Sequence, residues 1–160
     1  MEIQIHHFNN SEVQAHREEL QRFIHSLKEE KLTFSLDYEQ ILSAKELCVG
    51  TDELGNWLGL GGYRLKWGVG IFFLVIHRDM QNKGLGKQLT LEVLKNFPRW
   101  RILLLSVSRS NAAARRLYDG AGFKTLHRTS MHVIMGLKQG LFPLVKPILV
   151  AIFRLKHLGS

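Results

Sequence analysis

The hydrophobic and polar positions along the chain predict helices and strands in alternation. Ile3 and Ile5 alternate with polar residues, which is the period of a half-buried strand. The next apolar residues recur at the spacing of one helical face: Leu20, Phe23, Ile24 and Leu27. Residues 12–30 are therefore expected to form an amphipathic helix, beginning with a capping box of Ser11 and Gln14.

Further strands are expected after a second short helix around residues 36–45. The β-branched and aromatic stretches 46–51 and 56–67 flank a turn and predict an antiparallel pair. Residues 69–76 are almost entirely apolar, which is typical of a strand buried on both faces. The remaining strand-like segments are residues 102–107 and 123–135.

Two more helices are expected between these last strands. The first carries an i, i+4 ridge of Leu89, Val93 and Phe97 before Pro98 ends it. Residues 111–118 form the second, shorter helix. This order of elements predicts an α/β layered domain with a mixed sheet.

Composition places this domain among ordinary globular proteins. The 160 residues fit one domain, expected over 1–138, followed by a tail over 139–160. Cys48 is the only cysteine, and residues 1–20 do not resemble a signal peptide, so a cytoplasmic setting is expected. The formal charge of +8 attracts anions, of which a phosphate-bearing cofactor, nucleic acid, an anionic membrane and an acidic substrate are candidates.

The sequence favours neither a metal site nor a nucleic-acid partner. Among eight histidines no pair has ligand spacing on a helix. His6 and His7 point to opposite faces of a strand, as do His127 and His132, so no metal site is expected. The basic residues are dispersed without interleaved aromatic side chains, so no nucleic-acid partner is expected.

The loop over residues 81–86 is the main candidate for a binding site, because it lies between a buried strand and a helix. The first N–H groups of a helix have no intrahelical partner and attract anions. Gly84 and Gly86 let the backbone approach a phosphate closely. Three cations flank the loop: Arg78, Lys83 and Lys87.

Two common phosphate motifs do not fit this loop. A Walker A loop requires glycine and a hydroxyl residue where Gln81 and Gln88 stand. A dinucleotide fingerprint requires glycine at Leu89. The sequence therefore supports neither an ATPase nor a Rossmann dehydrogenase.

Two motifs together resemble a known family. The loop matches Gln/Arg-x-x-Gly-x-Gly/Ala, and residues 111–123 match Asn-x-x-Ala-x-x-Leu-Tyr-x-x-x-Gly-Phe. Both occur in this order, each after a buried strand, as in the GNAT superfamily of N-acetyltransferases. The resemblance covers about residues 69–125. It implies a mixed, mostly antiparallel sheet flanked by helices, with a splayed central strand pair.

The resemblance also implies acetyl-CoA as cofactor and assigns residues to it. Backbone groups of Leu74, Val75 and Ile76 would bind the pantetheine arm, and Asn111 would contact the same arm. The pyrophosphate would be held by the loop: Gln81, Asn82, Lys83, Gly84, Leu85, Gly86 and Lys87. Tyr118 would protonate the leaving thiolate, since the pKa of a tyrosine exceeds that of a thiol.

The implied reaction is direct attack of a primary amine, on a small molecule or peptide, on the thioester. No general base stands out, because residues 71–76 carry no carboxylate and Ser106 stands where ribosomal-protein N-terminal acetyltransferases have glutamate. His77, Asp52, Glu53 and a water chain remain open. The alternative is a non-catalytic acyl-CoA-binding sensor or regulatory protein.

The tail is apolar and basic over residues 141–158. Pro143 and Pro147 interrupt it, and a bilayer span needs about 20 apolar residues, so it is too short to cross a membrane. Packing on the domain or a homodimer contact is favoured over contact with an anionic membrane surface.

Overall fold

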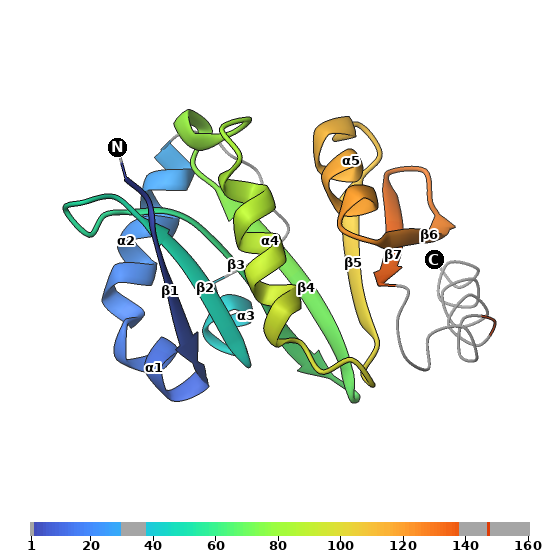
Figure 1. Cartoon of the computed structure of the whole chain (residues 1–160), viewed down its shortest axis with the longest axis horizontal. Helices are drawn as coiled ribbons and strands as arrows, with labels where there is room; N and C mark the ends of the chain where they lie inside the picture. Colours follow the sequence, from blue (N-terminus) through green and yellow to red (C-terminus); the bar gives the residue numbers. More distant parts are fainter. Residues whose placement is uncertain (1, 30–37, 138–146, 148–160) are drawn as a thin grey trace. The chain divides into compact units, whose positions relative to one another are not determined.

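The computed structural model describes residues 2–29, 38–137 and Pro147 (Figure 1). In chain order the elements are β1 (Gln4–Asn9), α1 (Asn10–Ala15), α2 (Arg17–Glu29), α3 (Tyr38–Leu42), β2 (Glu46–Thr51), β3 (Trp57–Lys66), β4 (Val69–Ile76), the 3-10 helix η1 (Arg78–Met80), α4 (Leu85–Asn96), β5 (Leu103–Ser108), α5 (Ala112–Gly120), β6 (Phe123–Arg128) and β7 (His132–Leu137). The chain divides into two compact units. Unit 1 comprises Met1–Lys66 and Phe72–Asn96, and unit 2 comprises Trp67–Ile71 and Phe97–Ser160.

Seven strands form one hydrogen-bonded order, β1-β2-β3-β4-β5-β7-β6. The pairs β1–β2, β2–β3, β5–β7 and β6–β7 are antiparallel. The β4–β5 pair is parallel, through Gly70 opposite Leu103 and Ile71 opposite Leu104, all within unit 2. The predicted mixed, mostly antiparallel α/β fold is confirmed.

The first predicted helix is two helices, and its predicted cap is wrong. Asn9 caps α1: its side chain accepts hydrogen bonds from the N–H groups of Ser11 and Glu12, while its own N–H donates to Glu12. Ser11 therefore lies inside α1. That helix ends at His16, and α2 follows directly. The side chain of Asn10 donates to the Ala44 carbonyl oxygen at 2.8 Å, which ties α1 to the segment before β2.

The apolar core of unit 1 lies between α1–α3 and one face of its strands. Its buried side chains come from both layers: Val13, Leu20, Phe23, Ile24, Leu27, Ile41, Ala44, Leu47, Val49, Leu60, Phe73 and Val75. The predicted helical ridge of α2 is thus confirmed as a buried face. Helix α4 packs on β2 and β3 in the same unit (Figure 1).

Unit 2 contains a hairpin where one long strand was predicted. The segment 123–135 turns after Arg128, because Thr129 N–H donates to the His132 carbonyl oxygen and His132 N–H donates to the Thr129 hydroxyl. The strands β6 and β7 result, and β7 pairs with β5. Leu104 and Leu126 form the centre of a small core with Val69, Ile71 and Ile102 around them.

The tail predictions lie outside the described residues, apart from Pro147. Within residues 2–29 and 38–137, no helix has the length and apolar character needed to span a bilayer.

Candidate functional site

The candidate binding loop is an ordered connection between β4 and α4 in unit 1. After Ile76 the chain makes the short η1 helix, in which Met80 is buried. A turn over residues 81–84 then leads into α4. The Gln81 side-chain amide donates to the Ile76 carbonyl oxygen at 3.3 Å. This bond joins the two ends of the loop, so Gln81 shapes the loop in addition to any contact it makes with a ligand.

Two loop residues have left-handed backbone conformations. Asn82 has φ 61° and Gly84 has φ 89°. A Cβ atom on Gly84 would meet nothing within 4 Å, so glycine is required there for its φ angle rather than for packing. The space beside this backbone is open. Alternating backbone handedness of this kind turns successive N–H groups toward one side and forms a concave anion site.

Leu85 holds the start of α4 against the sheet of unit 1. Its side chain is 1% exposed and lies over Gly50 of β2 and Gly59 of β3. One turn later Leu89 packs beside Gly61. The glycines leave room for α4 to approach, and the helix start is fixed where the loop needs it. Leu89 and Val93 of the predicted ridge are buried on α4, whereas Phe97, also buried, lies just beyond the helix, which ends at Asn96.

Exposed cations surround this loop. Arg78, Lys83 and Lys87 all have exposed side chains. They add to the partial positive charge of the α4 N-terminus. The loop is therefore suited to a multiply charged anion.

The part of β4 assigned to the cofactor arm is an edge strand of its own unit. Unit 1 contributes the order β1-β2-β3-β4, which leaves Phe72–Ile76 with one neighbouring strand, β3. Val75 is buried, while Leu74 and Ile76 are half-buried. A strand edge offers unpaired N–H and C=O groups to an extended ligand.

Asn111 and Tyr118 belong to unit 2, where Asn111 is the N-cap of α5. Its side-chain oxygen accepts a hydrogen bond from the Ala114 N–H at 3.0 Å. The side-chain amide nitrogen has no hydrogen-bond partner within the described part of the chain. The cap thus uses the oxygen of the Asn111 side-chain amide. The nitrogen of that amide can donate to another group.

Tyr118 lies on the buried side of α5. Its side chain is 7% exposed and makes an edge contact with Phe123, with ring centroids 5.9 Å apart. Burial raises the pKa of Tyr118 above its ordinary value of about 10. The phenol therefore keeps its proton over the whole physiological range.

Asp52, one of the candidate bases, already accepts several hydrogen bonds. The Asp52 carboxylate accepts hydrogen bonds from the backbone of Leu54 and Asn56 and from the Asn56 side chain. The Asn56 side-chain bond is the main cause that lowers the pKa of Asp52. Asp52 organises the turn before β3 and is a weak proton acceptor.

His77 is tied to α2. The Ser26 hydroxyl donates to the Phe23 carbonyl oxygen at 2.6 Å and lies 3.0 Å from His77 Nε2. When the Ser26 hydroxyl donates to Phe23, the tautomer of His77 that keeps both bonds carries its proton on Nε2. In that tautomer Nδ1 is the ring nitrogen that can accept a proton.

Sequence reasoning missed two cavities, because no spacing along the chain links their residues. The first, of about 280 Å³ in unit 1, is lined by Glu19, Arg22, Phe23, Ser26, Gly55, Asn56, Trp57 and His77. The second, of about 340 Å³ in unit 2, is lined by Ala112, Arg115, Arg116, Asp119, Thr125, Arg128 and Met135. The lining of the second cavity includes Arg115, Arg116 and Arg128 against the single carboxylate of Asp119, so this cavity favours anions.

Comparison with known proteins agrees with this arrangement. The sequence model of the acetyltransferase (GNAT) family matches residues 12–123. No curated protein sequence matches the chain closely enough to count as a relative.

Similar solved structures share the fold. A GNAT-family acetyltransferase from Streptococcus pneumoniae has 20% identity and a TM-score of 0.64, covering 84% of this chain and 98% of that one. Escherichia coli ElaA has 13% identity and a TM-score of 0.67, covering 86% and 100%. The yncA protein of Salmonella typhimurium, solved with its cofactor acetyl-CoA, has 17% identity and a TM-score of 0.61, covering 86% and 94%.

The family model spans well over half of the chain, and both of its motifs lie on strand–helix units of the expected fold. This protein therefore belongs to the acetyltransferase (GNAT) family, whose members are enzymes that use acetyl-CoA.

Proposed function

We propose that this enzyme transfers the acetyl group of acetyl-CoA to a primary amine of a small molecule or peptide. The observation that carries the proposal is the loop before α4. Asn82 and Gly84 are left-handed there, and the space beside Gly84 is open. Acetyl-CoA supplies an acetyl group activated as a thioester. The loop amides from Asn82 to Lys87 would bind its pyrophosphate, and backbone groups of Leu74, Val75 and Ile76 would bind its extended arm.

Tyr118 is expected from the resemblance to protonate the leaving thiolate, and we propose instead that it donates a hydrogen bond to that sulfur. Because burial raises the pKa of Tyr118, the phenol is a hydrogen-bond donor and a poor source of a free proton. Donation of a hydrogen bond stabilises a departing thiolate without leaving a tyrosinate behind. The proton for the thiol then comes from the amine itself, which becomes a strong acid once it has attacked the thioester.

The amine must be neutral before it attacks. Asp52 has a lowered pKa and accepts hydrogen bonds from Leu54 and Asn56, and the Nε2 atom of His77 is in a hydrogen bond with Ser26. We therefore assign removal of the first proton to solvent water rather than to either side chain. The rate is expected to rise with pH as the amine substrate deprotonates.

Binding is tested by thermal unfolding with and without acetyl-CoA. A ligand at about 100 times its Kd stabilises the native state by about 2.7 kcal/mol. Lys83→Gln should weaken binding, whereas Lys45→Gln, at another exposed lysine, should not. Absence of a thermal shift in the wild type at high acetyl-CoA concentration would sink the proposal at its first step.

Catalysis is tested separately, by mass spectrometry of amine panels incubated with acetyl-CoA. Acetylated product formed by the wild type and reduced in Tyr118→Phe supports the proposal. Tight acetyl-CoA binding with no product from polyamines, amino acids, aminoglycosides or peptides would favour a non-catalytic acyl-CoA-binding protein. A cytoplasmic location and a homodimer contact through the tail stay predictions from the sequence.

A further inference from the structure

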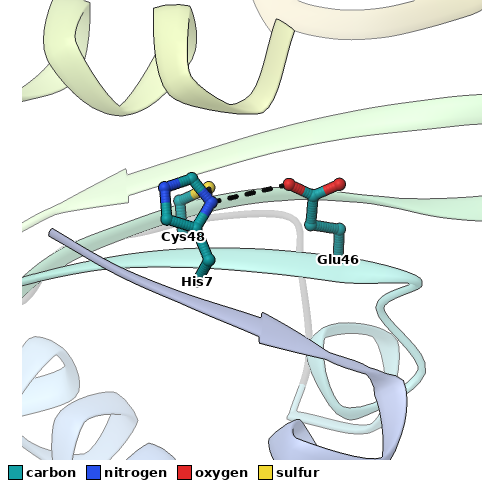
Figure 2. A group of neighbouring side chains, drawn as sticks. All are labelled: His7, Glu46 and Cys48. Carbon is teal, nitrogen blue, oxygen red and sulfur yellow. Dashed lines mark hydrogen bonds and ion pairs between the residues drawn. The ribbon is translucent and has the colours of Figure 1, made fainter. Parts of the chain in front are cut away.

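A cluster of three metal-ligating residue types lies on the α4 side of the sheet in unit 1, apart from the loop. His7 stands on β1, while Glu46 and Cys48 stand on β2 (Figure 2). In the β1–β2 register His7 is directly opposite Cys48, and Glu46 stands two residues before Cys48 on β2. Opposite residues share a face, as do residues two apart on one strand. The fold therefore directs all three side chains to one place.

The two separations from His7 Nδ1 are close to those of neighbouring ligands on a tetrahedral ion. His7 Nδ1 lies 3.4 Å from Cys48 Sγ and 3.7 Å from Glu46 Oε1. All three atoms lie within 4.8 Å of one another. In a tetrahedral zinc site, ligand bonds of about 2.0–2.3 Å place neighbouring ligand atoms roughly 3.3–3.6 Å apart. Small side-chain movements are enough to close the site.

Glu92 of α4 contacts the His7 ring on the side away from the cluster. Its Oε2 atom lies 3.4 Å from His7 Nε2, the ring nitrogen that points away from Cys48. A carboxylate in this position holds the proton on Nε2 and leaves the lone pair of Nδ1 toward the cluster. Histidine ligands in metal sites are usually oriented by such a carboxylate.

We propose that His7 Nδ1, Cys48 Sγ and Glu46 form a binding site for a single Zn²⁺ ion, with Glu92 as the carboxylate that orients His7. A set of one nitrogen, one sulfur and one oxygen suits Zn²⁺ better than the hard cations Mg²⁺ and Ca²⁺. The ion would join the edge strand β1 to β2 at the place where α4 covers both. On binding, the thiol proton is released to solvent, and no oxidant or reductant is needed.

A nucleophilic role for Cys48 fits the same cluster less well. The side chain is fully buried, and burial with the nearby charges of Glu46 and Glu92 raises the pKa of the thiol to about 12. Reactive cysteines have lowered pKa values and partial exposure. The same two carboxylates attract a cation.

Asn96 shows where such a cation would sit. Its side-chain nitrogen lies 2.9 Å from Glu46 Oε1 and 3.3 Å from His7 Nδ1. Its N–H groups thus offer partial positive charge to two of the three proposed ligands. Access is from the surface, since the His7 side chain is 38% exposed and that of Glu46 is 18% exposed. Asn96 has to turn away when the ion enters.

The direct test uses Co²⁺ as a spectroscopic substitute for Zn²⁺ on chelator-treated full-length protein. Cys48 is the only cysteine, so a thiolate-to-cobalt charge-transfer band reports that residue alone. We expect one equivalent of Co²⁺ to produce the band and one equivalent of Zn²⁺ to remove it. A wild-type protein that shows no charge-transfer band overturns the proposal, whatever other sites bind the metal.

Calorimetric titration with Zn²⁺ then assigns the ligands. Cys48→Ser and His7→Gln should each weaken binding more than about 100-fold, and Glu92→Gln about 10–100-fold. His6→Gln is the matched control, because His6 precedes His7 on β1 and its Nε2 contacts Thr51 instead. Asn96→Ala should leave Zn²⁺ affinity unchanged or higher.

Circular dichroism checks the fold of each variant, and the isosteric Glu46→Gln variant serves if His7→Gln or Cys48→Ser fails to fold. If Zn²⁺ binds His7→Gln, Glu46→Gln and wild-type protein equally tightly, the ion lies elsewhere and the proposal is wrong. The experiment needs no acetyl-CoA, so its outcome is independent of the proposed acetyl transfer.

Discussion

Leu85 Cδ1 lies 2.8 Å from the position that a Cβ atom on Gly50 would take. The first residue of α4 thus rests directly on β2, and the glycine sets how closely the helix approaches.

Gly50→Ala is expected to destabilise the protein by about 1–3 kcal/mol, because the added methyl group displaces a buried leucine in a packed layer. Chemical denaturation measures the change. Gly120→Ala is the control: a Cβ there meets nothing within 4 Å, and alanine suits a helix end better than glycine. Equal stability of the two variants would show that Leu85 moves aside without cost.

The left-handed loop residues give a paired prediction on acetyl-CoA affinity. Gly84→Ala forces a Cβ into φ 89° and should cost about 1–2 kcal/mol or distort the loop, with weaker acetyl-CoA binding. Asn82→Gly removes the strain at φ 61° and should keep the affinity. Calorimetric titration with acetyl-CoA compares them. Unchanged acetyl-CoA affinity in Gly84→Ala would show that the left-handed backbone at residue 84 is not needed for cofactor binding.

Asn111 caps α5 and is proposed to contact the cofactor arm, and substitution can separate these two roles. Asn111→Ala should lose the cap of α5 and about 1 kcal/mol of stability, and should also bind acetyl-CoA less tightly. Asn111→Ser keeps a capping oxygen but has no amide nitrogen, so only affinity should fall. Thermal unfolding and calorimetric titration together give the answer. Wild-type affinity in both variants would make Asn111 a helix cap and nothing more.

Tyr118→Phe is expected to lower kcat by about 100–1000-fold, the range for loss of one donor to a developing negative charge, with little change in acetyl-CoA affinity. The raised pKa of Tyr118 has a further consequence for the pH–rate profile of the wild type. The phenol stays protonated, so its ionisation should cause no loss of rate up to about pH 10. A fall between pH 8 and 10 that is absent from Tyr118→Phe would contradict this.

Asp52 supplies a prediction at acid pH. Its pKa lies below the ordinary 3.8, first because of the Asn56 side chain, so the folded state favours the ionised carboxylate. The stability that this gives is present above pH 3.8 and is lost as pH falls through the lowered pKa. NMR titration should find that pKa below 3.8 in the wild type and nearer 3.8 in Asn56→Ala.

Asp52→Asn should leave the pH–rate profile of acetyl transfer unchanged. A lost alkaline-rising limb in that variant would instead identify Asp52 as the base.

Local signals in the sequence predicted most of the elements, because each depends on a few neighbouring residues. The helix face around Leu20 and Phe23 and the apolar strand before Ile76 are of this kind. The N-cap was mistaken because Ser11 and Asn9 are both good caps. The bonds that select Asn9 involve Glu12 and the packing of α1 on the segment before β2. The turn at Thr129 was missed because a threonine is also a favourable strand residue.

The loop and Tyr118 could be singled out from the sequence because the residues of each motif are close together along the chain. The cluster of His7, Glu46 and Cys48 has no such local signal, since neighbours on one strand such as His6 and His7 point to opposite faces and indicate nothing about the strand beside them. Only the register of β1 with β2 shows that His7 and Cys48 are opposite. That register is set by pairing between residues about forty positions apart, and no local pattern reports it.

The burial of Cys48 has a practical consequence for measuring the enzyme. With one thiol in the chain and that thiol fully covered, a colorimetric thiol reagent added during turnover should detect released coenzyme A against a protein background near zero. The folded protein also has no exposed cysteine with which to form disulfide-linked dimers on storage. A continuous assay without added reductant is therefore feasible for surveying amine acceptors.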